Sequence, residues 1–91
     1  MYTIAIFDVN FKTNKEKIEN ILRHFGFRKI QINTYIGKIS NVDLAIFKKE
    51  MELTIREKDS LIILPICDKC YSKKETFGRE INFSENLYRV F

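Results

Sequence analysis

Two stretches of this chain are apolar on both faces of an extended backbone, and this feature constrains the fold most. The first runs from Tyr2 to Val9 and the second from Leu61 to Cys67. Both are rich in β-branched and aromatic residues, which favour strands. Successive side chains of a strand point to opposite faces, so a sheet with one solvated face should alternate apolar and polar residues. Neither stretch shows that alternation, which predicts a sheet covered on both faces.

Helical periodicity appears in two places between these strands. Thr13 to Glu16 fit a capping box, which predicts the start of a first helix, and Gly26 ends it. Its apolar stripe has helical spacing and consists of Ile18, Ile21, Leu22 and Phe25. A second helix starts at Ser40 to Asp43. Its inner stripe consists of Leu44, Phe47, Met51 and Ile55.

The remaining strands complete a recognisable order. Residues 28–33 and 34–39 predict a hairpin with its turn near Asn33, and residues 87–91 predict a short fifth strand. The order βαββαβ plus a C-terminal strand is an α+β, ferredoxin-like arrangement. In it the first strand lies centrally in an antiparallel sheet. Both right-handed crossovers place their helices on one face of that sheet.

Those two helices leave the second apolar face without a cover. The chain has 91 residues, so we expect one domain over residues 1–91. The simplest cover is a symmetric homodimer joined face to face, with residues 79–91 at the interface. The tail strand would then extend the sheet edge of the partner. The alternative is that the tail and the preceding loop fold back over their own sheet.

The composition permits a polyanionic partner without requiring one, because the net charge is +4 and the pI is near 9.1. The longest apolar run, 61–67, is far shorter than the roughly 20 residues that span a bilayer. The N-terminus lacks a charged segment ahead of an apolar one, as a signal peptide would have. We therefore expect a cytoplasmic protein with no membrane partner.

Asp8 is the residue most indicative of chemistry, because it ends an apolar strand on the same side as Ile4 and Ile6. A carboxylate there must be solvated, paired or metal-bound, since burial alone costs several kcal/mol. The topology predicts that Asp8 and Asn10 lie near Thr34, Tyr35, Asp59 and Ser60. A face-to-face dimer would bring two copies of Asp8 together, and Mg²⁺ or Mn²⁺ would relieve their repulsion. A turn or helix cap is the structural alternative.

Basic residues near this edge are candidates for contacts with phosphates, and Tyr35 is a candidate for stacking on a base. The predicted nucleic-acid-binding residues are Lys12, Lys15, Lys17, Arg28, Lys29 and Tyr35. The alternatives are an ordinary solvated surface for the cations and simple packing for the tyrosine.

Cys67 and Cys70 form a Cys-x-x-Cys pair. One pair cannot complete a tetrahedral zinc site within a single chain. A thioredoxin-like motif would open a helix after a strand, whereas residues 69–74 are rich in lysine and predict a loop. The expected role is two small reduced residues near a strand end, and a metal site shared between subunits is the alternative.

Together these segments resemble the small CRISPR-associated endoribonucleases. The opening strand ends in the aromatic–aspartate pair Phe7-Asp8, as in that family, and Phe25-Gly26 resembles its helix exit. The other matching positions are residues 28–31, Tyr35, Gly37, residues 59–67, Cys70 and Gly78. The match covers residues 2–78. The order and spacing of the motifs are more specific than any one of them.

The resemblance implies a homodimer with Mg²⁺ at Asp8 that acts in CRISPR spacer acquisition with a larger integrase partner. It implies an endonuclease that hydrolyses phosphodiester bonds of RNA or double-stranded DNA. The alternative within the family is a non-catalytic DNA-binding scaffold that bridges integrase dimers. The virulence-associated toxin ribonucleases share the fold.

The sequence departs from the family at several positions. Phe7 replaces a frequent tyrosine, Asn33 a serine and Ile36 an acidic residue. Lys15 and Lys17 stand where some members carry arginines, and a lysine offers a point charge instead of a bidentate fork. Two other functions have no support in the residues. No residue indicates a small-molecule regulatory site, and residues 9–12 lack the glycines of an acylphosphatase-type phosphate loop.

Overall fold

The computed structural model describes residues 2–83 and has the predicted order of strands and helices. The elements are β1 (Tyr2–Asp8), α1 (Lys12–His24), β2 (Arg28–Gln31), β3 (Thr34–Lys38), α2 (Asn41–Thr54), β4 (Ser60–Ile66) and α3 (Asp68–Ser72). The predicted fifth strand at 87–91 lies outside the described residues.

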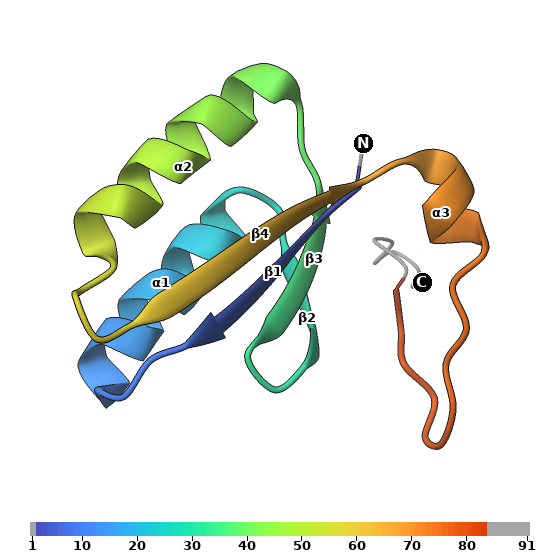
Figure 1. Cartoon of the computed structure of the whole chain (residues 1–91), viewed down its shortest axis with the longest axis horizontal. Coiled ribbons are helices and arrows are strands. Elements are labelled where there is room, and N and C mark those ends of the chain that lie inside the picture. Colours follow the sequence, from blue (N-terminus) through green and yellow to red (C-terminus); the bar gives the residue numbers. More distant parts are fainter. Residues whose placement is uncertain (1, 84–91) are drawn as a thin grey trace, which may run out of the picture.

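The four strands form one antiparallel sheet in the order β2-β3-β1-β4, with β1 inside and β4 at an edge. In the register of this sheet, Ile4 lies between Ile36 of β3 and Leu64 of β4. The two long helices, α1 and α2, lie on the same side of the sheet, and α3 lies beyond the other side (Figure 1). The α+β, ferredoxin-like prediction is therefore confirmed.

Helix α1 ends as predicted but starts differently. Gly26 has a φ of 87°, and the N–H groups of Gly26 and Phe27 donate to the carbonyls of Arg23 and Leu22. This is a Schellman motif, which needs a left-handed residue after the helix. The predicted capping box is wrong, because the N-cap is Phe11 and no side chain caps it. Asn14 is buried and bonds to Asp59 instead, so a long-range contact replaces the local one.

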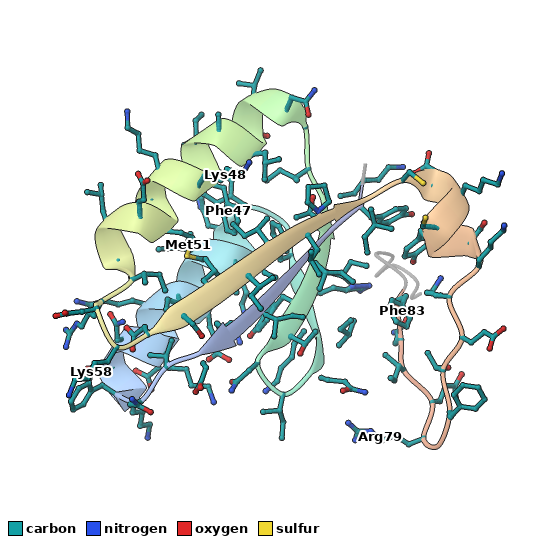
Figure 2. All side chains as sticks on the ribbon, in the orientation of Figure 1. Phe47, Lys48, Met51, Lys58, Arg79 and Phe83 are labelled. Atoms are coloured by element: carbon teal, nitrogen blue, oxygen red, sulfur yellow. The ribbon has the colours of Figure 1, made fainter. Side chains whose placement is uncertain are left out.

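The core lies between the two long helices and the sheet. Phe47 and Met51 of α2 point toward the sheet (Figure 2) and are almost fully buried. The ring of Phe47 stacks on Phe27 with centroids 5.0 Å apart. Gly37 allows this packing, because a Cβ there would lie 2.8 Å from Cγ of Phe27. The predicted inner stripe of the second helix is thus confirmed.

The opposite face of the sheet, which we call the open face, carries exposed apolar side chains. Ile6, Ile62 and Leu64 are 36%, 52% and 47% exposed. Helix α3 covers one end of this face, because Tyr71 stacks on Tyr2 with ring centroids 3.7 Å apart. The apolar character predicted for both faces is present, but within residues 2–83 only the helix side is fully covered. The predicted homodimer remains a prediction.

Residues 67–74 differ from the predicted loop. Cys67 is the N-cap of α3, and Cys70 lies in its first turn. The lysine-rich segment still forms this short helix, and just beyond its end the ammonium of Lys74 lies over the ring of Tyr71, 3.5 Å from the centroid. A strand followed directly by a helix therefore frames the Cys-x-x-Cys pair.

Candidate functional site

Asp8 is the last residue of β1 and is exposed to solvent. Its partner in the neighbouring strand is Ser60, the first residue of β4. On the other side, the N–H of Phe7 donates to the carbonyl of Asn33 at 3.1 Å, so the β2–β3 turn flanks the same end. Within residues 2–83 the Asp8 carboxylate has no hydrogen-bond or ion-pair partner. The predicted placement of Asp8 beside these turns is confirmed, and its carboxylate is free to bind a ligand.

Asp59 is close in sequence to Ser60 but has a structural task. Its Oδ2 accepts a hydrogen bond from Nδ2 of Asn14 at 2.7 Å and another from the N–H of Arg56 at 3.1 Å. These bonds fix the turn between α2 and β4 against α1. Asp59 therefore positions Ser60 beside Asp8, and its oxygen is already engaged.

The oxygen atoms near Asp8 suit a hard cation in type. Asn33 has a φ of 57°, and its buried Oδ1 has no hydrogen-bond partner in the described part of the chain. Carboxylate and amide oxygens are ligands that Mg²⁺ accepts, usually with several waters retained. No group of three or more His, Cys, Asp or Glu side chains that could hold a metal occurs in residues 2–83. A site based on Asp8 therefore needs a second copy of the chain or a phosphate to complete it.

The predicted lysines of α1 divide between two sides of the helix. Lys12 begins α1 three residues after β1 and is exposed, and Lys15 is half-buried one turn later. Lys17 instead lines a small crevice with Leu53 and Arg56, between α1 and the end of α2. Lys12 and Lys15 thus stay near the Asp8 end of the sheet, whereas Lys17 faces α2.

Arg28 and Lys29 lie away from Asp8. Arg28 pairs with Ile36, which is opposite Ile4, so it lies two strands across from β1 and four residues short of its end. Standard strand spacings give about 13 Å along the strands and about 10 Å across them. The prediction that these cations surround the Asp8 edge is wrong, because the hairpin runs back along the sheet. The Nε and Nη2 atoms of Arg28 are buried without a hydrogen-bond partner among the described residues.

Tyr35 belongs to the core. It is 0% exposed, its hydroxyl donates to Glu19 at 3.1 Å, and Nη2 of Arg23 donates to that hydroxyl at 3.3 Å. Burial, with the Glu19 hydrogen bond as the second cause, raises the pKa of Tyr35 to about 12. The tyrosine cannot stack on a base in this position. The structure shows the alternative, in which Tyr35 packs in the core.

Two cations at the Asp8 end were not selected from the sequence. Arg56 and Lys58 are exposed in the turn before β4, and Lys58 lies at the same end of the molecule as the start of α1 (Figure 2). The guanidinium of Arg56 lies 5.9 Å from the centroid of the Phe11 ring. The signal was available, because antiparallel pairing places the residues before Ser60 at the Asp8 end.

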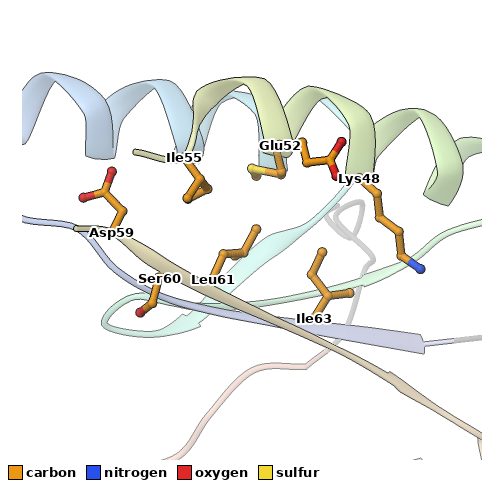
Figure 3. Close-up of a pocket in the computed structure, with 8 residues that line it drawn as sticks. Lys48, Glu52, Ile55, Asp59, Ser60, Leu61 and Ile63 are labelled. Carbon is orange, nitrogen blue, oxygen red and sulfur yellow. The ribbon is translucent and has the colours of Figure 1, made fainter. Parts of the chain in front are cut away.

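A groove of about 400 Å³ runs between α2 and β4 (Figure 3). Its lining is largely apolar, with Lys48, Glu52 and Asp59 as the charged residues; the others are Met51, Ile55, Ser60, Leu61 and Ile63. Oδ2 of Asp59 accepts both hydrogen bonds in the turn, so this oxygen is not available at the Asp8 end of the groove. The groove lies beside the outer edge of β4, which has no strand partner in the described chain, and so suits contact with another segment.

Solved structures share this fold. A hypothetical protein, TT1823, from Thermus thermophilus is similar with a TM-score of 0.75 and 17% identity, covering 89% of this chain and 96% of that one. Streptococcus pyogenes Cas2 is similar with a TM-score of 0.69 and 17% identity, covering 86% and 100%. The arrangement is thus that of a ferredoxin-like domain with Cas2 proteins among its structural neighbours.

The sequence itself defines the family. Residues 1–74 match the family model of CRISPR associated protein Cas2. A curated protein of Nanoarchaeum equitans, named CRISPR-associated endoribonuclease Cas2, is 35% identical over 81 residues, which is 88% of this chain and 87% of the relative. A protein of the same name from Dictyoglomus turgidum is 31% identical over 96% of this chain and 99% of its own. The chain belongs to the Cas2 family. In residues 2–83 no helix is long and apolar enough to cross a membrane.

Proposed function

We propose that this protein is a metal-dependent endonuclease of CRISPR spacer acquisition that acts in the cytoplasm as a homodimer with an integrase partner. The observation that carries the proposal is the exposed carboxylate of Asp8 at the end of an apolar open face, with no partner among residues 2–83. The curated relatives are named endoribonucleases, which makes RNA the first substrate to test and double-stranded DNA the second.

The open face supports the dimer. Ile6, Ile62 and Leu64 lie on it, on the same side of the sheet as Asp8, and burying them favours association. Arg28 lies on the same face, and its buried Nε and Nη2 atoms have no hydrogen-bond partner among residues 2–83. A two-fold axis near the end of β1 brings the two Asp8 carboxylates together.

In such a dimer Asp8 of each subunit would hold Mg²⁺ or Mn²⁺, which would supply polarisation of the phosphate and activation of water. Lys12, Arg56 and Lys58 lie at the same end and bind phosphates of the flanking nucleotides. Asn33 contributes an amide oxygen at the adjacent turn. One carboxylate per chain explains why both subunits are needed.

The test uses labelled single-stranded RNA and double-stranded DNA with the wild-type dimer. We expect cleavage in Mg²⁺ and none in EDTA. Asp8→Asn should lower the cleavage rate by roughly 100-fold or more. Asp68→Asn is the matched control, because Asp68 is an exposed carboxylate on α3 at the opposite end of the sheet. Isothermal titration with Mg²⁺ gives a second readout and should lose its signal in Asp8→Asn.

Cleavage that survives both EDTA and Asp8→Asn would reject the metal mechanism. Complete absence of cleavage in the wild-type protein would favour the second candidate, a non-catalytic DNA-binding scaffold that bridges integrase dimers. The cations near Asp8 favour that candidate, because they hold DNA without needing a reaction. It predicts that Lys58→Glu weakens the DNA–integrase complex while Asp8→Asn leaves spacer acquisition intact.

A further inference from the structure

The junction of β4 and α3 carries a pair of thiols outside the site described above. Cys67 follows the last residue of β4 and caps α3, and Cys70 lies in the first turn of that helix. Both side chains are exposed, and both cysteines are free. The pair lies at the far end of the sheet from the turn that precedes β4 (Figure 1). Neither thiol contributes to the core, so both are available for chemistry.

The geometry holds the sulfur of Cys67 against the backbone of Cys70. The N–H of Cys70 donates to Sγ of Cys67 at 3.4 Å, which fixes the Cys67 side chain over the first turn of α3. Helix α3 is itself anchored, because the residue after Cys70, Tyr71, stacks on Tyr2 at 3.7 Å. A disulfide between the two cysteines therefore closes within one turn of backbone that is already in place.

The two thiols differ in acidity. The backbone N–H of Cys70, followed by the Cys70 thiol, lowers the pKa of Cys67. The side-chain hydrogen bond with Cys67, followed by the charge of Cys67, raises the pKa of Cys70. A thiolate attacks a disulfide and a thiol does not. Cys67 is therefore suited to be the attacking sulfur, and Cys70 to be the resolving thiol.

We propose that Cys67 and Cys70 form a redox-active dithiol that exchanges with disulfides of the glutathione class, with Cys67 as the attacking sulfur. The Cys67 thiolate attacks one sulfur of the oxidised glutathione, forming a mixed disulfide and releasing one glutathione thiolate, which takes up a proton. Cys70 then loses its proton and attacks Sγ of Cys67, releasing the second glutathione. Two electrons pass from the protein to the oxidant, and the protein gains one internal disulfide.

The experiment treats the reduced full-length protein with oxidised glutathione in the presence of a chelator and follows the products by intact-mass spectrometry. The chain has two cysteines, so each product has a distinct mass. The wild-type protein should lose two hydrogens and retain no glutathione. Cys70→Ser should accumulate the mixed disulfide, because the second attack is missing. Cys67→Ser should react at least about 10-fold more slowly than Cys70→Ser at neutral pH.

Several outcomes would overturn the proposal. Equal rates for the two single variants would remove the assigned order of attack. A stable mixed disulfide on the wild-type protein, or a disulfide joining two chains, would show that the sulfurs do not pair within one chain. A second measurement needs no variant: a limiting amount of iodoacetamide on the wild-type protein should label Cys67 before Cys70, as mapped on peptides. Preferential labelling of Cys70 would contradict the assignment.

Discussion

The two faces of the sheet use the same strands and end in different environments. On the helix side of β1, Thr3, Ala5 and Phe7 are at most 3% exposed, whereas Ile6 on the other face is 36% exposed. The alternation within one strand places adjacent residues on opposite faces, so that Ile6 and Phe7 lie in different environments. The helix face supplies the core that holds a single chain together. The open face leaves apolar side chains partly exposed within the described residues, and Asp8 lies at its end.

The largest expected effect of this difference is on the stability of the fold. Phe47→Ala removes a fully buried ring that contacts Phe25 and Phe27, and it should lower the free energy of unfolding by about 3–5 kcal/mol. Ile62→Ala removes a side chain that is 52% exposed, so its cost within one chain should be at most about 1 kcal/mol. Urea denaturation at low protein concentration measures both values.

Equal losses in the two variants would contradict the division of tasks. A large loss for Ile62→Ala that grows with protein concentration would instead show that folding and association are coupled, because the folded dimer is then the species that unfolds.

The second expected effect is on association and tests the open face as a dimer surface. Ile62→Asp places a charge in the proposed interface and should raise the dimer dissociation constant by about 100-fold or more. Leu53→Asp is the control, because Leu53 is 85% exposed on α2, on the helix side. Sedimentation velocity across a dilution series reads the dissociation constant.

A wild-type protein that is a folded monomer at micromolar concentration would contradict the proposal that the open face is a dimer surface. The open face would then be covered by residues of the same chain. This is the alternative given in the sequence analysis, in which the tail and the preceding loop fold back over their own sheet. Ile62→Asp would in that case reduce thermal stability without changing the sedimentation coefficient.

The sequence was sufficient for the fold because its strongest signals are local periodicities. The stripe of α2, the Gly26 helix end and the hairpin turn at Asn33 are each encoded within a few residues, and each is present in the structure. The pairing of Asp8 with Ser60 also followed, since the ferredoxin-like order fixes which strands are neighbours. The topology thus predicted the backbone position of Asp8 but not the side chains around it.

The failures came from contacts between residues distant in sequence. Asn14 bonds to Asp59 instead of supporting a cap, and the Tyr35 hydroxyl reaches Glu19 and Arg23 on α1. Neither pairing has a local pattern. Helix α3 was missed because its support is the stacking of Tyr71 on Tyr2, at the other end of the chain. Side-chain partners across elements are set by packing, and a single sequence does not reveal them.

A smaller effect is expected from the hydrogen bond between Asn14 and Asp59, which joins α1 to the turn before β4. Asn14→Ala leaves the Asp59 carboxylate without its side-chain partner and should destabilise the protein by about 1–3 kcal/mol. Because Asp59 fixes the turn before Ser60, the variant should also weaken Mg²⁺ binding at Asp8, measured by titration. Asn20→Ala is the control on the same helix, where the side chain is exposed. A destabilised variant with unchanged Mg²⁺ affinity would separate the turn from the site.

The smallest effect concerns Tyr35 and is confined to the closed face. The pKa of Tyr35 is about 12 in the folded protein and 10.0 in its ordinary state, so between these values the unfolded chain releases a proton that the folded chain keeps. Stability is therefore fully present below pH 10 and falls as pH rises toward 12. Tyr35→Phe removes this loss.

At neutral pH the same variant loses the hydroxyl contacts with Glu19 and Arg23, which costs about 1 kcal/mol. The two stability curves, measured by urea denaturation across pH, should cross between pH 10 and 12. Parallel curves would mean that Tyr35 reaches solvent when it ionises, and the contrast between a closed and an open face would be weaker than the burial indicates.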